Sequence, residues 1–379
     1  MKFGLIMKIA RKSKKMVTNA RKFSRKFKKY GKKFSNASKK VKRQYKRLKV
    51  KAARAWGKIK CNALWGHPVD AVTGEVVTEH LDFSLPWRIP IEWYRYYGSQ
   101  VKRMGTCGFG WETPADIRLE FEEDGTVLFQ NGTGAPAYFD FLPEKKPVYD
   151  AEDGSILEKE KDYYTVRVKE DLIYYFPIPK GPVQEVLVEY VKDPHGNSIQ
   201  YVRDKNGLKE IRENCGRSIA VTTIDGRIEK MSLIYPYHDP FLLVNYAYDE
   251  SGNLITASDA MKGSYGFAYE NHLLARETNK NGVSFYYEYD KLTPEGKCIH
   301  TYGDDGLYDY RFTYKDEEKT TEVADSSGNI TYLKYNEFNM ITEETDFLGG
   351  VTSYRYDDAG RTTAVIDPDG NKTEYVYDK

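Results

Sequence analysis

The sequence predicts a mainly β protein, a curved sheet of repeated hairpins preceded by a basic α-helical arm over residues 1–60. After residue 60, short alternating runs rich in Val, Ile, Thr, Tyr and Phe are separated by Gly, Asn, Asp and Pro. This pattern is typical of strands divided by turns. An aromatic-x-Tyr-Asp/Glu element then recurs about every 21 residues. A repeat of fixed length predicts a solenoid-like array.

The repeated element occurs seven times, and its last positions are 21, 20, 25, 21, 21 and 21 residues apart. Those positions are Asp249, Glu270, Asp290, Lys315, Asn336, Asp357 and Asp378. A second element, with Asp followed three residues later by Gly, falls between them at Asp325, Asp346 and Asp367. One hairpin cannot bury its own aromatic face, so we expect neighbouring hairpins to pair into a ribbon that strand twist curls.

Each repeat supplies a pair of aromatic side chains and a turn. Positions i and i+2 of a strand share a face, so we expect the pair of one unit to stack on the pair of the next. The repeat tyrosines are Tyr246, Tyr248, Tyr287, Tyr289, Tyr354, Tyr356, Tyr375 and Tyr377. In the turns, Asp357 and Asp367 should accept hydrogen bonds from nearby backbone N–H groups, while Gly360 and Gly370 take a positive φ.

The net charge of +2 conceals two parts of opposite charge. Residues 1–60 hold 25 Lys and Arg and no Asp or Glu, which leaves 33 basic and 56 acidic side chains in the remainder. Apolar residues recur every three or four positions from Phe23 to Ile59, so the arm should be an amphipathic helix. We expect it to bind an acidic membrane surface or nucleic acid; binding to the acidic remainder of the chain is the alternative. The candidate polyanion-binding residues are Lys22, Arg25, Lys26, Lys29, Lys33, Lys40, Arg43 and Arg47.

No catalytic or cofactor motif is found in the sequence, and we predict neither enzyme activity nor a cofactor or metal. The four cysteines, Cys61, Cys107, Cys215 and Cys298, are too far apart for a zinc-binding pair. His67 and His80 lie near Asp70, Glu75 and Asp82, the one segment where a metal or acid–base site could be proposed. A turn or strand-edge role explains His67 without a metal.

Export signals of the usual kind are also lacking. The apolar run from Phe3 to Met7 is too short for a secretory signal, and no stretch approaches the length of a membrane span. Export would therefore use a route that reads no such signal.

The segment 66–77, GHPVDAVTGEVV, together with residues 82–86 and 91–97, resembles the block that opens the shell of Rhs/YD-repeat proteins. The similarity continues in residues 108–111 and 116–119 and, with the repeats, covers residues 61–379. It predicts an Rhs N-terminal β domain over residues 61–190 and a YD-repeat ribbon over residues 191–379.

This resemblance implies a function. Rhs proteins are polymorphic toxins of interbacterial competition, in which the repeat shell encloses a variable C-terminal toxin domain that has an immunity protein. The resemblance implies a structural, encapsulating role, a toxin domain and a secretion apparatus as partners, and a cytoplasmic protein that is later secreted or delivered at the cell surface. Many members carry a PAAR tip domain where this chain has its basic arm. No toxin cleavage site is carried over, because residues 367–371 read as an ordinary repeat turn.

Two further expectations follow from the repeats. No atypical capping unit follows Tyr377, so we expect the ribbon to be incomplete at its C-terminal end. Aromatic rings and carboxylates also suit sugars, so a cell-surface or secreted carbohydrate-binding YD-repeat module is the alternative function.

Overall fold

The structure is a computed structural model that describes residues 64–377 except 133–135, 145, 151–153, 170, 236 and 358–359. All of these residues belong to the second of two compact units, residues 50–379. The predicted helical arm and its eight candidate polyanion-binding residues lie outside the described residues.

The described residues are mainly β, as predicted, and most of their strands form one antiparallel sheet of 22 strands. Its first strands are β11 (Val148–Tyr149), β12 (Ile156–Lys159), β13 (Tyr163–Arg167), β14 (Ile173–Pro177), β16 (Tyr190–Lys192), β17 (Ser198–Asp204), β18 (Gly207–Glu213), β19 (Ser218–Ile224), β20 (Arg227–Ile234), β21 (Phe241–Tyr248) and β22 (Leu254–Asp259). It continues with β23 (Ser264–Glu270), β24 (Leu273–Thr278), β25 (Ser284–Tyr289), β26 (Cys298–Gly303), β27 (Tyr310–Lys315), β28 (Thr320–Asp325), β29 (Ile330–Tyr335), β30 (Ile341–Thr345), β31 (Val351–Tyr356), β32 (Thr362–Ile366) and β33 (Lys372–Glu374).

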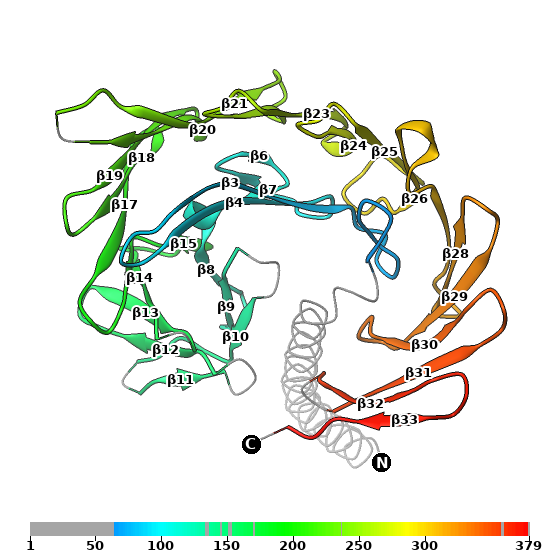
Figure 1. The fold of residues 1–379 in the computed structure, drawn as a ribbon. Coiled ribbons are helices and arrows are strands. Elements are labelled where there is room, and N and C mark those ends of the chain that lie inside the picture. Colours follow the sequence, from blue (N-terminus) through cyan, green and yellow to red (C-terminus); the bar gives the residue numbers. More distant parts are fainter. Residues whose placement is uncertain are drawn as a thin grey trace, which may run out of the picture. The chain divides into compact units, whose positions relative to one another are not determined.

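This long sheet curves, and smaller elements from the start of the chain lie on its concave side (Figure 1). They are the pair β1 (Leu64–Trp65) and β2 (Val69–Asp70), the pair β5 (Met104–Gly105) and β6 (Gly108–Phe109), and the 3₁₀ turn η1 (Pro114–Asp116). A three-stranded sheet, called the inner sheet below, contains β3 (Val77–Leu85), β4 (Ile91–Gly98) and β7 (Trp111–Glu112). A four-stranded sheet contains β10 (Ala137–Phe139), β9 (Val127–Gln130), β8 (Arg118–Phe121) and β15 (Glu185–Leu187). A second 3₁₀ turn, η2 (Asp304–Gly306), joins β26 to β27.

The long sheet begins at Val148, before the predicted ribbon boundary at residue 191. The strand β15 interrupts the sequence between β14 and β16 and pairs with β8 instead. The division at residues 190 and 191 therefore stays a prediction about domains, while the sheet itself crosses it without a break.

The core lies where the inner elements meet the long sheet. One hydrophobic cluster holds Trp93 and Trp111 of the inner sheet together with Phe267 and Phe285 of the repeats. Both tryptophans are fully buried. Burial of large aromatic side chains dominates the packing energy of such a contact.

The second tyrosine of most repeats joins neighbouring strands of the long sheet. A β-bulge immediately precedes Tyr248, Tyr289 and Tyr356, where the strand begins to diverge from its neighbour. Their hydroxyls donate to backbone carbonyls near the start of the preceding strand: Tyr248 to Ile228 at 2.5 Å, Tyr289 to Leu274 at 2.9 Å and Tyr356 to Ile341 at 2.6 Å. Bulges bend a strand and increase its twist, which allows the ribbon to curve.

The expected stacking of tyrosine pairs between units is not found among the described residues. Equivalent tyrosines lie on alternate strands, about 9.6 Å apart at a strand spacing of about 4.8 Å, which exceeds the reach of a ring contact. Ring contacts occur within a strand instead, as between Phe312 and Tyr314, whose centroids are 6.2 Å apart. The repeat is held by hydroxyl-to-carbonyl hydrogen bonds rather than by an aromatic ladder.

Candidate functional site

A tyrosine hydroxyl from each of three successive repeats forms a polar tie with the inner sheet or its preceding turn. Trp93 donates its indole N–H to the hydroxyl of Tyr246 at 3.0 Å, and Trp111 donates to Tyr269 at 2.8 Å. In the third repeat, Tyr287 donates to the carbonyl oxygen of His67 at 2.5 Å. These ties join residues 153 to 220 positions apart in the chain. Successive repeats therefore hold successive points of the inner elements.

A buried ion pair lies beside the first tie. Arg95, which is 0% exposed, donates to both carboxylate oxygens of Asp82, at 2.7 and 2.9 Å. Tyr246 also donates to Asp82, and the guanidinium lies 4.9 Å from the ring centroid of Trp111. Burial alone would lower the pKa of Arg95, but the carboxylate of Asp82 raises it above its usual value. The charge is thus retained at the centre of the contact, where losing its partner would be costly.

His80 of the inner sheet contacts a carboxylate of the long sheet. Its Nε2 atom lies 3.0 Å from Oε1 of Glu277, and both side chains are buried. Burial raises the pKa of Glu277, but the hydrogen bond and charge of His80 outweigh it, so the pKa lies below its usual value. The ring of His80 packs 4.1 Å from that of Tyr265. This histidine therefore fixes the inner sheet to β24.

His67 packs flat on a repeat side chain rather than facing a catalytic partner. Its ring lies 3.5 Å from the ring of Phe285, and burial lowers its pKa. No cluster of three His, Cys, Asp or Glu side chains that could hold a metal occurs in the described part of the chain. Cys107, Cys215 and Cys298 are free thiols.

The segment 66–77 is a tight turn that fits against β26. Asp70 is buried and accepts hydrogen bonds from the amides of Val72 at 2.8 Å and Thr73 at 2.9 Å. Burial raises the pKa of Asp70 to about 7. Gly74 has φ +74°, and a Cβ there would lie 2.8 Å from Cα of Lys297. This turn therefore requires glycine for both its conformation and its approach to the repeat sheet.

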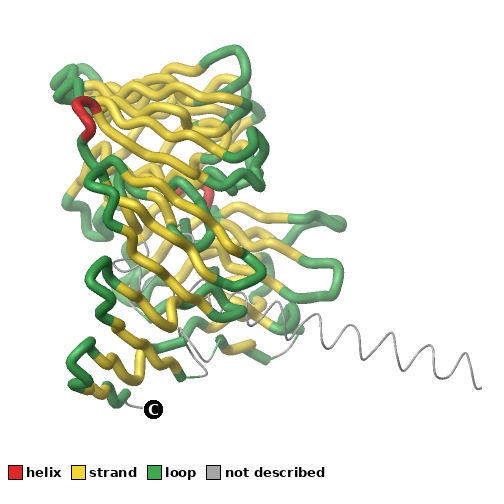
Figure 2. The backbone as a smooth tube through the Cα atoms, turned by 90° about the vertical axis from the view of Figure 1, so that its right-hand side faces the viewer, coloured by secondary structure: helices red, strands yellow, loops and turns green. Residues whose placement is uncertain are grey.

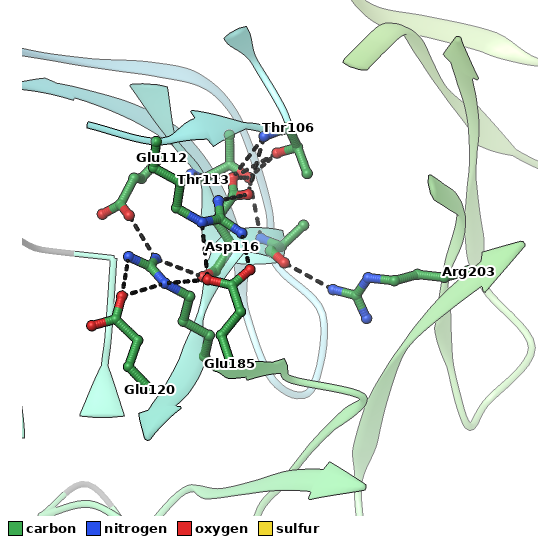
Figure 3. A network of polar contacts seen from close by, with 10 residues as sticks. Thr106, Glu112, Thr113, Asp116, Glu120, Glu185 and Arg203 are labelled. Atoms are coloured by element: carbon green, nitrogen blue, oxygen red, sulfur yellow. Dashed lines mark hydrogen bonds and ion pairs between the residues drawn. The ribbon is translucent and has the colours of Figure 1, made fainter. Parts of the chain in front are cut away.

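A second polar network holds the other side of the inner sheet, centred on Asp116 (Figure 3). The carboxylate of Asp116 accepts from the amides of Thr106 at 3.0 Å and Thr113 at 2.9 Å and from Arg103 at 3.0 Å. Arg103 also lies 2.9 Å from Glu185 of β15. The network thus joins the loop after β5 to the four-stranded sheet.

Arg118 extends this network. It lies 2.6 Å from Glu112 and 2.8 Å from Glu120, and burial raises the pKa of Glu112 despite that contact. From the long sheet, Arg203 donates to the carbonyl of Ala115 at 2.8 Å, as Figure 3 shows. A pocket of about 560 Å³ beside the network is lined by Arg103, Arg118, Glu112, Glu120 and Glu185, among others. Its charges are matched to one another, which fits a structural junction.

The predicted repeat and turn residues of the later units keep their hydrogen bonds within the long sheet. Tyr354 donates to Glu344 at 3.3 Å, and Tyr377 donates to the carbonyl of Thr362 at 2.7 Å. Tyr375 and Tyr377 are 45% and 41% exposed. The turn residues lie at hairpin ends and are Asp357, which accepts from the amide of Arg361, Asp367, which accepts from the amide of Asn371, and Gly360 and Gly370, with φ +73° and +84°.

Sequence reasoning missed the partners that make the contact. Trp93, Arg95 and Trp111 stand in a segment that we matched by resemblance alone, and nothing in their spacing points to Tyr246 or Tyr269. The signal that could have been used is the high aromatic content of β4, with Trp93, Tyr94, Tyr96 and Tyr97 in eight residues, which exceeds what a two-sided solvent-exposed hairpin needs.

Family profiles match the start of the described chain and its last repeats. A family described as "Domain of unknown function (DUF6531)" matches residues 66–139, called the opening block below. The family "RHS Repeat" matches residues 335–372 and 356–379.

Three curated toxins are similar to the chain. They are "Double-stranded DNA deaminase toxin A" of Burkholderia cenocepacia, 27% identical over 282 residues, "Probable deoxyribonuclease RhsB" of Dickeya dadantii, 25% over 281, and "Toxin protein Tse5" of Pseudomonas aeruginosa, 23% over 318. The chain is a member of the Rhs/YD-repeat polymorphic toxin family.

The similarity to these Rhs relatives covers 71 to 72% of this chain but only 19 to 24% of theirs. The chain thus spans about a fifth of the length of the curated relatives that it matches. Among solved structures, the Rhs chain is similar to "Crystal Structure of TcdB2-TccC3-TEV", with 12% identity, a TM-score of 0.29, and coverage of 70% of this chain and 16% of the other. A TM-score this low does not establish a shared fold. No helix among the described residues is long and apolar enough to cross a membrane.

Proposed function

We propose that the chain is a non-catalytic stretch of wall in a shell that encloses the toxin domain of an Rhs protein, and that the opening block sets the curvature of that wall. The observation that carries the proposal is the continuous sheet of 22 strands that curves around the opening block. The concave side of this sheet is lined by aromatic side chains that are hydrogen-bonded to the opening block, and such a surface is better suited to enclosing another domain than to catalysis.

The tyrosine ties support the role of the opening block. Tyr246, Tyr269 and Tyr287 belong to successive repeats, and each contacts a different point of residues 66–111. Three fixed points along a flexible ribbon define an arc. In this proposal, contacts with the opening block determine the curvature of the repeat sheet as it folds.

The partners follow from the shell role. The enclosed partner is a C-terminal toxin domain, and its immunity protein protects the producing cell. The assembled protein resides in the cytoplasm before a secretion apparatus delivers it to a neighbouring cell. Two of the relatives are named as a DNA deaminase and a probable deoxyribonuclease, which are enzymes that act on DNA. We assign no such activity to the repeats.

The basic arm has a separate proposed role in binding an anionic surface through Lys22, Arg25, Lys26, Lys29, Lys33, Lys40, Arg43 and Arg47. Liposome flotation with anionic vesicles and DNA titration, each at two salt concentrations, test it. Binding should weaken steeply as salt rises. Absence of binding to both ligands would favour association of the arm with the acidic remainder of the chain.

Cryo-electron microscopy of the complete gene product tests the shell proposal. We expect density for a folded domain enclosed by the repeat wall, with the opening block on the concave side. An open sheet without an enclosed domain would contradict the proposal. A glycan array probed with the same protein tests the carbohydrate-binding alternative, and saturable binding to one defined sugar would favour it.

A further inference from the structure

The repeat sheet has two rims that differ in character. Strands β20 to β33 are consecutive antiparallel neighbours, so their connections lie alternately at opposite ends of the strands, and Figure 2 shows loops along both ends. One rim contains the connections that follow β20, β22, β24, β26, β28, β30 and β32. The opposite rim contains those that follow β21, β23, β25, β27, β29 and β31.

Exposed large apolar side chains gather on the first rim, called the apolar rim. They are Tyr235, Tyr237, Phe241, Met261, Leu307, Tyr308, Phe347 and Leu348. Tyr237 is fully exposed, and Met261 and Leu348 are 89% and 81% exposed. On the opposite rim, this class comprises Leu292 in a connection and Tyr375, Val376 and Tyr377 after the last strand. Single exposed apolar residues are ordinary, but their concentration on one rim calls for an explanation.

The turns hold these side chains outward. Asp259 accepts hydrogen bonds from the amides of Met261 at 2.8 Å and Gly263 at 2.9 Å. Asp346 accepts in the same way from the amides of Leu348 at 2.9 Å and Gly350 at 2.8 Å. In both loops the apolar residue stands two positions after the aspartate, at the tip of a turn that its own amide helps to close.

The form of the apolar rim favours a deformable partner over a rigid protein surface. The tips protrude in small groups of one to three side chains, and the polar turns 279–283 and 325–329 lie among these groups. A rigid partner would need a matching pocket for each tip along a curved line, whereas the boundary of a lipid bilayer can accommodate each tip independently. Tyr, Phe, Leu and Met are side chains that enter this boundary favourably.

Charge selects the kind of lipid. Asp239, Asp259, Asp304 and Asp346 lie in the same connections as the tips, and the chain after residue 60 holds 56 acidic against 33 basic side chains. A surface of this sign is repelled by anionic lipid. We propose that the apolar rim binds the surface of zwitterionic phospholipid membranes by shallow insertion of its tips.

Flotation of the full chain with phosphatidylcholine vesicles tests this proposal at high salt, where attraction between the basic arm and any charged surface is screened. The wild-type chain should float with the vesicles. A triple variant with Tyr237→Ser, Met261→Ser and Leu348→Ser should have a partition coefficient onto the vesicles that is lower by at least about tenfold, because three apolar side chains of the rim are lost. The matched control on the opposite rim, Leu292→Ser, should stay within about twofold of wild type.

A gain of signal complements this loss. The variant Leu348→Trp should partition more strongly, and its added indole fluorescence should shift to the blue on vesicle addition, because tryptophan prefers the membrane interface. Light scattering without vesicles separates lipid binding from self-association through the same rim.

Three outcomes would overturn the proposal. The wild-type chain fails to float with phosphatidylcholine, or the triple variant floats as well as wild type, or the triple variant only lowers the mass of a self-associated species. Flotation restricted to anionic vesicles and abolished by salt would assign binding to the arm and would equally overturn the role of the rim.

Discussion

The repeats of β21–β27 and those of β29–β33 share one sequence element but use its first tyrosine differently. Tyr246 and Tyr287 are 5% and 3% exposed and contact the opening block, whereas Tyr375 is 45% exposed. The second tyrosine does the same work in both regions, as Tyr289 and Tyr356 show by donating to the preceding strand. The second tyrosine therefore mainly builds the sheet, and the first one is available for docking wherever an inner element reaches it; Tyr269, a second tyrosine that contacts Trp111, is the exception.

The largest expected difference between the two regions concerns their ion pairs. Asp82→Asn removes the counter-charge of Arg95, which is fully buried, and should lower the free energy of unfolding by about 3–5 kcal/mol. Glu343→Gln, which removes the partner of exposed Lys334 in the later repeats, should cost at most about 1 kcal/mol. Urea unfolding of both variants measures the two losses of unfolding free energy. Similar losses in the two variants would show that the inner contact carries no special stability.

The next effect is a pH dependence that arises from Asp70 in the opening block. The pKa of Asp70 is about 7 in the folded chain, against an ordinary value of 3.8. Between these pH values the folded state keeps a proton that the unfolded state has released, so this group makes stability fall as the pH rises from about 4 to about 7, by up to about 4 kcal/mol, and level off above that. Asp70→Asn retains an oxygen acceptor for Val72 and Thr73 and cannot ionise.

Thermal unfolding of Asp70→Asn and wild type at a series of pH values tests this prediction. The variant should gain stability relative to wild type as the pH rises towards 7. Parallel stability curves across this range would mean that Asp70 does not hold its proton in the folded state.

Two glycines with positive φ distinguish the cost of the left-handed backbone conformation from the cost of a steric contact with a neighbouring strand. Gly370→Ala in the later repeats meets open space and should cost about 1–2 kcal/mol for the left-handed conformation alone. Gly74→Ala adds a contact with the backbone of Lys297 and should cost about 1–3 kcal/mol more. Denaturant midpoints of the two variants report the difference. Equal costs would imply that the turn at Gly74 does not press against β26.

The smallest expected difference comes from single hydroxyl groups. Tyr246→Phe leaves the indole N–H of Trp93 buried without its acceptor and should cost about 1–3 kcal/mol. Tyr354→Phe removes a hydroxyl from a half-buried site beside Glu344 and should cost about 0.5–1.5 kcal/mol. Chemical unfolding compares them, and a larger loss in Tyr354→Phe would reverse the proposed ranking of the two regions.

The repeats could be predicted from the sequence because their information is local. Strands, hairpins and turn aspartates such as Asp367 each depend on residues within about one repeat, so spacing and residue type suffice. The packing between units was predicted wrongly, since the stacking of tyrosines ignored the two-strand separation of equivalent residues. The docking of the opening block could not be predicted, because Trp93 and Tyr246 are 153 positions apart and their pairing depends on the curvature of the whole ribbon.

The segment that carries His67 and His80 shows the same limit of local sequence information. The sequence places both histidines near several carboxylates along the chain, which is the pattern that prompts a metal or acid–base hypothesis. In the fold, the partner of His80 is Glu277, almost 200 residues later. The nearby Asp82 is taken by Arg95. Local spacing could not reveal that His80 contacts Glu277 across the interface with the long sheet.

Hydrogen exchange measured by mass spectrometry tests most directly whether the opening block stabilises the repeats it contacts. The double variant Trp93→Phe and Trp111→Phe removes two of the three ties to successive repeats while keeping aromatic bulk. We predict that amides of β21–β27 exchange about tenfold faster or more in this variant, while those of β29–β33 exchange as in wild type. Unchanged exchange in β21–β27, or equal acceleration in both regions, would contradict the account.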